Sequence, residues 1–404
     1  MEQVDYIPRN VDSVLGLPHP QRGEKAERPK ALIVSHSYIS AENQKNIVAL
    51  SQSIDVRVAV PQSFKSRIFQ TVEPTNEAQV LQIFRTFHLP KSQFLLRPFD
   101  LNLSSSPASI INVEYDPWCT IFWQALIARN RNNPSAKLVC SVKSNTYTDY
   151  PGVIGKLKHY ITERGVRAVD CFLACGEKVA QIYRQQFGVP SEKILTCYHL
   201  GVDTDLFSPA ESPKQVDPRR FIVGYCGRFD EDKGVIQLVE AVRTCRGILK
   251  ADVQFYLLGK GRLTNVIDAY DSAHTWIHRF DPVPHDAVPD FLRQLDVFVL
   301  PSRITPQKEE HDAHALAEAL SVGLPCIGTD SGIIPELLQG GAGTVAAANS
   351  IDALVEALVR MFKDSALRVK LQTKARKRAI ETLSIQAVAQ KKAALFHRLG
   401  GIRP

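Results

Sequence analysis

Two glutamates, Glu310 and Glu318, lie eight positions apart beside a run of small and apolar residues. The chain around them, from Val297 to Leu338, reads as a buried strand, a polar loop, a helix, a second buried strand and a turn before another helix. This order predicts that carboxylates and helix N-terminal amides face the crevice beyond a parallel sheet, where such folds bind ligands. A carboxylate accepts hydrogen bonds from two hydroxyls, which suits a ribose diol or a sugar.

Two cations precede this segment in GYCGRFDEDKGV, where Arg228 and Lys233 flank an acidic turn between a buried strand and a helix. Arginine forks onto two phosphate oxygens, lysine supplies a mobile charge, and a helix N-terminus adds amides. The pattern predicts a diphosphate site, with solvated loop cations as the alternative interpretation. Beyond the glutamates, Ser331 and Gly332 follow the second strand, and Ser331 is predicted to cap the helix that begins near Ile333.

Short apolar runs alternate with helical patterns along the chain. The first half has predicted strands at residues 31–36, 56–61, 110–115, 137–142, 171–175 and 193–198. After a polar segment with two Ser-Pro steps, further strands begin at residues 221, 253, 275, 297 and 325. Strands separated by helices predict an α/β fold of doubly wound parallel sheets.

A chain of 404 residues is too long for one core, so we expect two domains. The predicted parts are a Pro-rich leader (1–29), an N-terminal Rossmann-like domain (30–198), a linker (199–220), a C-terminal Rossmann-like domain (221–380) and a final helix (381–404). The 44% hydrophobic and 23% charged residues are ordinary for a globular protein.

The cell compartment is predicted from features that the sequence lacks. The N-terminus MEQVDYIPRN shows no basic and apolar signal pattern, and the apolar stretch Ile121–Ala128 is too short to span a bilayer. Most of the eight cysteines lie in or beside apolar runs, as reduced buried thiols do. We therefore expect a cytoplasmic protein.

Positive charge is concentrated in the first half of the chain. Residues 1–200 hold 23 Lys and Arg against 17 Asp and Glu, which is six of the seven net positive charges. The densest run, Gly155–Arg167, places Leu157, Tyr160 and Ile161 between its charges. It is predicted to be an amphipathic helix that lies on an anionic membrane, at the inner membrane face. The alternative interpretation is a helix face exposed to solvent. No nucleic-acid partner is predicted.

Together these motifs resemble the retaining glycosyltransferases of family 4, which have the GT-B fold. The resemblance is carried by GRFDEDKGV, by PSRITPQKEE with the glutamate spacing, and by GTDSGIIPEL. In the first half, IINVEYDPW resembles the family's segment at the interdomain cleft, and GVDTDLFSP resembles its linker. The resemblance extends from about Ala31 to the C-terminus.

The resemblance implies two Rossmann-like domains facing a central cleft that holds a nucleotide-sugar. By this comparison Arg228 and Lys233 hold the diphosphate, Glu318 binds the ribose, and Glu310 binds the transferred sugar. Ser331 and Gly332 complete the donor side. The final helix crosses back towards the N-terminal domain, and Asp203-Thr204-Asp205 is a turn in the linker and not a metal site.

The acceptor side and the reaction also follow from the resemblance. Candidates to bind the acceptor hydroxyl come at or after strand ends at the expected cleft edge, and they are His36, Tyr38, Glu114 and Asp116. No nucleophile is evident, so front-face departure is implied, with the leaving phosphate taking the acceptor proton. Fixed cations would stabilise that phosphate without a metal, and no cofactor is expected.

The chain departs from the family pattern just after the first glutamate. Asp312 and Ala313 stand where the family has an aromatic residue and a glycine. Alanine restricts the backbone, and Asp312 adds a negative charge near the leaving diphosphate. His311 and His314 are candidates to offset this charge or to bind an acidic sugar or acceptor.

The sequence thus predicts a metal-independent retaining glycosyltransferase. It would move a sugar from UDP or GDP to a glycan or lipid-linked acceptor, in polysaccharide or glycolipid biosynthesis. Two alternatives remain open, a sugar-nucleotide epimerase of the same fold and a non-catalytic nucleotide-sugar-binding protein.

Overall fold

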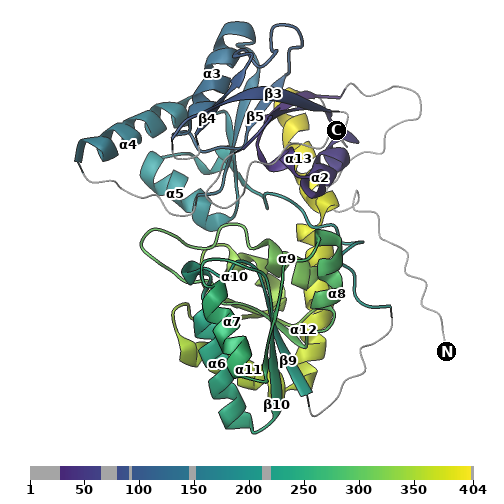
Figure 1. The fold of residues 1–404 in the computed structure, drawn as a ribbon. Coiled ribbons are helices and arrows are strands. Elements are labelled where there is room, and N and C mark those ends of the chain that lie inside the picture. The colour runs from purple at the N-terminus through teal and green to yellow at the C-terminus, as the bar shows by residue number, and fades with distance from the viewer. Residues whose placement is uncertain (1–27, 65–79, 91–92, 145–151, 212–219, 402–404) are drawn as a thin grey trace, which may run out of the picture.

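The computed structural model describes residues 28–64, 80–90, 93–144, 152–211 and 220–401. They form two α/β domains, one above the other in Figure 1. Within the described residues, no helix combines the length and apolar character that a bilayer crossing requires. The predicted leader falls almost wholly outside this part of the chain.

The first domain is built on an eight-stranded sheet with the order β4-β3-β2-β1-β5-β6-β7-β8. Its strands are β1 (Lys30–Val34), β2 (Asp55–Pro61), β3 (Leu81–His88), β4 (Phe94–Arg97), β5 (Ile110–Val113), β6 (Lys137–Val142), β7 (Cys171–Ala174) and β8 (Ile194–Thr196). All neighbours pair in parallel except β3 and β4. The sheet is parallel as predicted except at this edge, where two strands that we did not predict form an antiparallel pair.

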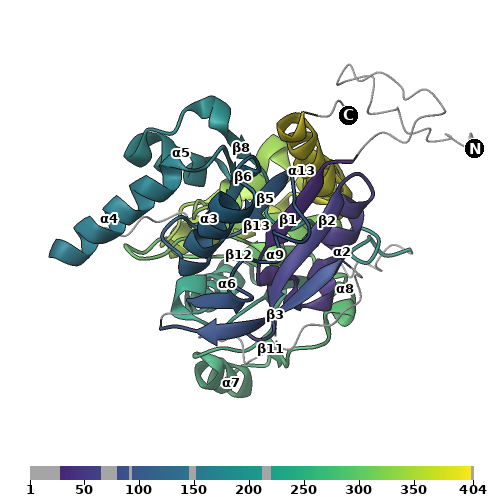
Figure 2. The same cartoon turned by 90° about the horizontal axis from the view of Figure 1, so that it is seen from above.

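Helices accompany this sheet because their apolar faces bury against it. They are α2 (Ala41–Ser51), α3 (Thr120–Asn132), α4 (Gly152–Arg167) and α5 (Glu177–Phe187). Seen from above, α4 reaches outward past the edge of the domain (Figure 2).

The second domain has a parallel six-stranded sheet with the order β11-β10-β9-β12-β13-β14. Its strands are β9 (Arg220–Cys226), β10 (Asp252–Leu258), β11 (Ile277–Phe280), β12 (Val297–Leu300), β13 (Cys326–Thr329) and β14 (Thr344–Ala346). Its helices are α6 (Val235–Leu249), α7 (Thr264–Ala273), α8 (Val288–Leu292), α9 (His314–Ser321), α10 (Ile334–Leu337), α11 (Ile351–Lys363) and α12 (Ser365–Arg378).

Strand order fixes where ligands can bind in both domains. The order reverses between β1 and β5 in the first sheet and between β9 and β12 in the second. In open α/β sheets the crevice beyond such a reversal is the preferred ligand site. Residues 35–38 and 114–116 follow the first pair of strands, and residues 227–233 and 301–310 follow the second pair.

The chain crosses back to the first domain at its C-terminal end. A π-helical turn, η6 (Ala379–Leu383), leads into α13 (Ile385–Gly400), which packs on α2. The linker meets this crossing, because Val202 N donates to Leu383 O at 2.8 Å and Ile385 N donates to Val202 O at 3.0 Å. Gly201 lies so close to the backbone of Ile385 that no side chain would fit there.

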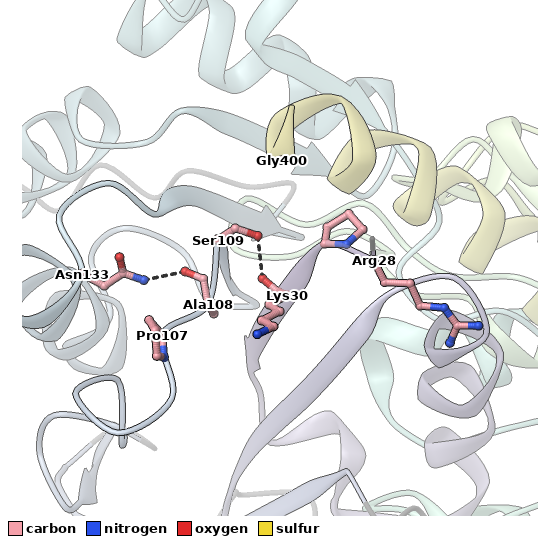
Figure 3. A pocket seen from close by; sticks show the side chains of 8 residues that line it. Arg28, Lys30, Pro107, Ala108, Ser109, Asn133 and Gly400 are labelled. Atoms are coloured by element: carbon pink, nitrogen blue, oxygen red, sulfur yellow. Dashed lines mark hydrogen bonds between the residues drawn. The ribbon is translucent and has the colours of Figure 1, made fainter. Parts of the chain in front are cut away.

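A pocket of about 390 Å³ lies at the opposite edge of the first sheet, by the amino ends of β1 and β5 (Figure 3). Two polar side chains that line the pocket hydrogen-bond to nearby backbone carbonyl oxygens. Ser109 Oγ donates to Lys30 O at 3.0 Å and Asn133 Nδ2 donates to Ala108 O at 2.6 Å. The predicted acceptor-side residues His36, Glu114 and Asp116 lie at the other edge of this sheet, beyond the carboxyl ends of β1 and β5.

Candidate functional site

The centre of the candidate site is a buried ion pair between Lys233 and Glu310. Lys233 ends the short helix η3 (Glu231–Lys233), and its Nζ lies 2.5 Å from Glu310 Oε2. Ser302, just after β12, donates a second hydrogen bond of 2.6 Å to the same oxygen. The pair forms because β9 and β12 are neighbours, which places the loops that follow them side by side.

Electrostatics keep Glu310 ionised in this buried place. Burial alone would raise its pKa, but the charge and hydrogen bond of Lys233, together with Ser302, lower the pKa of Glu310 to about 2. The side chains of Lys233 and Glu310 are only 15% and 4% exposed. The site thus holds a fixed cation and a fixed anion in low-dielectric surroundings, where both act strongly on a ligand.

Ser331 and Gly332 hold the loop that carries Glu310. Glu310 N donates to Ser331 Oγ at 3.1 Å, and Ser331 Oγ donates to Arg303 O at 3.1 Å. Gly332 N donates to Glu309 Oε2 at 3.0 Å. The prediction that Ser331 caps the following helix was wrong, because its hydroxyl serves the Glu310 loop and α10 has no side-chain cap.

Arg228 and Glu318 have other partners. Arg228 forms an ion pair with Asp230, and its carbonyl accepts a 2.6 Å hydrogen bond from Tyr225. Glu318, on α9, accepts a 2.8 Å hydrogen bond from His285. The structure therefore joins Lys233, Glu310, Ser331 and the Gly332 segment directly, whereas Arg228 pairs with Asp230 and Glu318 with His285. Sequence reasoning missed His285, which lies in a Pro-containing loop 33 positions before Glu318.

Two acceptor-side candidates are deeply buried in the first domain. Glu114 has a fully buried side chain and accepts hydrogen bonds from Tyr38 (3.0 Å) and Lys392 (3.3 Å). Burial opposes its ionisation, yet Lys392 and then His199 lower the pKa of Glu114 to about 2. Asp116 accepts from Ser144 Oγ at 2.6 Å and Tyr183 OH at 3.0 Å, and burial raises its pKa.

His36 is the most accessible of the four candidates. Its Nδ1 hydrogen-bonds to the hydroxyl of Tyr115, and its ring stacks on Phe64 with 4.1 Å between ring centroids. Burial, reinforced by Lys143, lowers the pKa of His36 to about 3. Its imidazole is therefore neutral near pH 7.

The loop that departs from the family pattern contacts the first domain. Tyr198 OH donates to Asp312 O at 2.6 Å, and Cys175 Sγ donates to His311 O at 3.5 Å. Asp312 Oδ1 lies 3.4 Å from His314 Nε2. Burial opposes the ionisation of Asp312, but His314 and Lys143 hold its pKa below the usual range. The hypothesis that His314 offsets the charge of Asp312 stays a prediction.

Ala313 adopts the left-handed backbone that a glycine would take, with φ 47° and ψ 37°. This conformation costs an L-residue about 1–2 kcal/mol, and glycine would avoid that cost. Glycine also has more conformational freedom in the unfolded chain, which offsets part of the stabilisation. We expect Ala313→Gly to stabilise the protein by about 0.5–1 kcal/mol, measured as a raised melting temperature.

The matched control is Ala315→Gly, two positions further along inside α9. That change should destabilise the protein by about 1 kcal/mol, as glycine does within a helix. A loss of stability in both variants would contradict strain at position 313.

Two further contacts join the donor-side loops to α5 of the first domain. Glu336, at the end of GTDSGIIPE, accepts hydrogen bonds from the backbone N–H groups of Glu177 (2.6 Å) and Lys178 (3.4 Å) at the α5 N-terminus. Lys178 Nζ forms an ion pair with Glu309. The segments on either side of Glu310 therefore both bind the opposite domain.

The turn predicted in the linker is present. Asp203 Oδ1 accepts hydrogen bonds from the backbone N–H groups of Asp205 and Leu206, both at 3.1 Å, and Asp203 Oδ2 pairs with Lys45 on α2. Among the described residues, no group of three or more His, Cys, Asp or Glu side chains is placed to hold a metal ion.

Comparison with known proteins decides the class of the second domain. Residues 209–378 match the family model "Glycosyl transferases group 1". The C-terminal domain is a group 1 glycosyl transferase domain. The expected resemblance to glycosyltransferases and the expected enzyme class are confirmed at this level.

Curated relatives of this glycosyl transferase domain act in bacterial glycan synthesis. The chain is 26% identical over 251 residues to the lipopolysaccharide core biosynthesis mannosyltransferase LpsB of Rhizobium meliloti. It is 24% identical over 188 residues to the capsular polysaccharide biosynthesis glycosyltransferase CapM of Staphylococcus aureus. The alignments cover 58% and 44% of this chain, and 67% and 46% of those relatives.

Solved structures show that the two domains together have the GT-B fold that the sequence predicted. Sucrose-phosphate synthase from Thermosynechococcus elongatus superposes with a TM-score of 0.70 at 17% identity, over 93% of this chain and 100% of that one. HepE of Anabaena, solved with UDP-glucose, superposes with a TM-score of 0.66 at 16% identity, over 91% and 99% of the two chains.

Proposed function

We propose that the protein is a retaining, metal-independent glycosyltransferase that moves a sugar from UDP or GDP to a glycan or lipid-linked acceptor. The observation that carries this proposal is the buried Lys233–Glu310 pair at the strand reversal of a group 1 glycosyl transferase domain. The whole chain would act in the synthesis of a polysaccharide or glycolipid, as the named relatives do.

In this proposal the donor is held by charge and by hydrogen bonds. Lys233 has three donor hydrogens, so it can keep Glu310 while it contacts a phosphate oxygen. Arg228 adds a second cation that a diphosphate can share with Asp230. Glu310 would accept hydroxyls of the transferred sugar, and Glu318 those of the ribose. As the C1–O bond breaks, the developing diphosphate charge is stabilised by cations that are already in place.

On the acceptor side, His36 is the group we propose to meet the incoming hydroxyl. Its neutral imidazole accepts or donates a hydrogen bond without adding charge to the cleft. Glu114 and Asp116 are buried and accept hydrogen bonds from protein donors, so we propose that they fix the end of the strand that precedes Tyr115, the hydrogen-bond partner of His36.

Donor turnover separates this proposal from its two alternatives. The purified protein would be incubated with a panel of UDP- and GDP-sugars, without added metal and with EDTA, and the products followed by NMR. A retaining glycosyltransferase slowly hydrolyses an α-linked donor and releases free nucleotide together with the α-anomer of the free sugar. An epimerase would return a changed sugar, and a non-catalytic binder would only be thermally stabilised. Either outcome overturns the proposal, as does inversion at C1 or loss of turnover in EDTA.

We also expect the first domain to bind anionic membranes through α4. Val153, Leu157 and Tyr160 are 82%, 56% and 53% exposed, and their spacing of four and three places them on one face of the helix. Lys156, Arg164 and Arg167 are exposed on the same helix. Apolar burial combined with about 1 kcal/mol per surface cation is the usual basis of interfacial binding.

The full chain should therefore co-sediment with phosphatidylglycerol vesicles at low salt and be released as salt rises. Leu157→Ser should reduce the bound fraction several-fold. Val369→Ser, which removes a 62% exposed valine from α12, should leave binding unchanged. Equal binding by the two variants, or equal binding to phosphatidylcholine vesicles, would show that α4 is a solvated helix.

A further inference from the structure

His285 makes a contact that the proposed donor site does not explain. It opens the short helix η4 (His285–Ala287), and its Nε2 lies 2.8 Å from Glu318 Oε1. An ionised carboxylate only accepts hydrogen bonds, so Nε2 carries the proton and donates it. The side chains are 38% and 13% exposed, so the bond is partly shielded from water.

The His285 ring is held by a second contact on the side of the linker. It packs on Phe207, which is fully buried, with 5.1 Å between ring centroids. Arg376 and the hydroxyl of Ser321 both donate to the carbonyl oxygen of Phe207, which fixes that residue against α9 and α12. The imidazole therefore reaches Glu318 from a rigid support.

We infer that His285 is a positioning residue, which fixes the carboxylate of Glu318 so that its second oxygen faces the ribose of the nucleotide donor. This inference rests on the proposed role of Glu318 in the function above. With Oε1 taken by His285, Oε2 remains to accept hydrogen bonds from the two neighbouring hydroxyls of the ribose. A carboxylate that is already oriented loses less conformational freedom when the ligand binds.

Charge around His285 makes the arrangement sensitive to pH. The hydrogen bond that His285 donates to Glu318 raises the pKa of His285, against the effect of burial, and the charge of Glu318 raises it further. Glu42 and Lys45 face it from α2 of the other domain, where Glu42 raises and Lys45 lowers the pKa, and Asp286 adjoins it in η4. The attraction between protonated His285 and Glu318 is fully present below pH 6.5, the ordinary histidine pKa. It is lost as the pH rises through the raised pKa of His285, because the imidazole then loses its charge. Nucleotide affinity should fall over the same interval.

The test is calorimetric titration of UDP and GDP into the full-length protein and its variants. His285→Ala should weaken nucleotide binding about tenfold, which corresponds to one charge-assisted hydrogen bond. His285→Gln, whose amide N–H can replace the donor, should recover most of the affinity but lose the dependence on pH above 6.5. In a Glu318→Ala background, His285→Ala should have no further effect.

His274→Gln is the matched control, because His274 also packs on an aromatic ring, that of Trp276, in the same domain. It should bind nucleotide like the wild type. Unchanged affinity in His285→Ala, or an equal loss with and without Glu318, would overturn the inference and leave the donor site standing. Tighter binding by His285→Ala would mean that His285 occupies the place of the ribose, which also overturns it. A wild-type protein that binds neither nucleotide would instead reject the proposed function itself.

Discussion

Replacing Lys233 by alanine is expected to abolish both donor turnover and the thermal stabilisation of the protein by nucleotide. The change removes the cation 2.5 Å from Glu310 and leaves a buried carboxylate where the diphosphate should bind. Breaking a buried pair on one side typically costs about 3–5 kcal/mol, so the ligand-free protein should also be less stable. Denaturant unfolding and thermal shifts with UDP and GDP measure the two effects.

A second substitution separates stability from binding in this test. Lys233→Ala combined with Glu310→Gln removes the unpaired charge, so most of the stability should return while nucleotide binding does not. Because the pKa of Glu310 is depressed to about 2, the pair contributes above the ordinary glutamate pKa and is lost as pH falls towards 2. Arg243→Ala, which breaks an exposed pair on α6, is the control that should change neither property. Nucleotide shifts that survive in Lys233→Ala would reject the donor site.

The other large effect is expected at Lys392, which ties the C-terminal helix to the first domain. Its Nζ reaches Glu114 at 3.3 Å and the carbonyl of His199 at 3.0 Å, and its side chain is 6% exposed. Burial lowers the pKa of His199 to about 3, so His199 cannot replace the missing charge near pH 7. Lys392→Met should therefore destabilise the protein by about 3–5 kcal/mol.

The neighbouring Lys391 supplies the comparison, because it is exposed on the same helix. Lys391→Met should shift the denaturation midpoint by no more than about 0.5 kcal/mol. Adding Glu114→Gln to Lys392→Met should restore most of the loss, and limited proteolysis should find α13 released in the single variant alone. Equal midpoints for the two lysine variants would show that the pair with Glu114 is not a structural tie.

Much of the second domain could be predicted from its sequence, because several of its buried strands are short, mostly apolar runs, although β14 was not predicted. The strands β9, β12 and β13 follow this rule, and the loops after them carry the predicted residues. β3 follows another pattern, with buried and exposed positions in alternation and with Ile83 and Phe87 about half exposed. A search for continuous apolar runs misses a strand of this kind, which lies next to the edge strand β4.

The contacts within the site were harder to predict than its residues. Lys233 and Glu310 are 77 positions apart, and their contact depends on β9 and β12 being neighbours, which local pattern does not specify. Lys391 and Lys392 are equivalent in the sequence, yet only the register of α13 decides which of them is buried. The hydroxyl of Ser331 could either cap the following helix or hydrogen-bond to the loop of Glu310. In the structure it accepts a hydrogen bond from Glu310 N.

The contact between Glu336 and the N-terminus of α5 places a limit on the size of residue 176. Gly176 precedes α5 with φ 100°, and a β-carbon there would lie 2.8 Å from the Glu336 carboxylate. Any larger residue would evict that carboxylate and strain the backbone as well. The single hydrogen atom that is the side chain of this glycine thus leaves room for the Glu336 carboxylate, and one contact between the two domains depends on it.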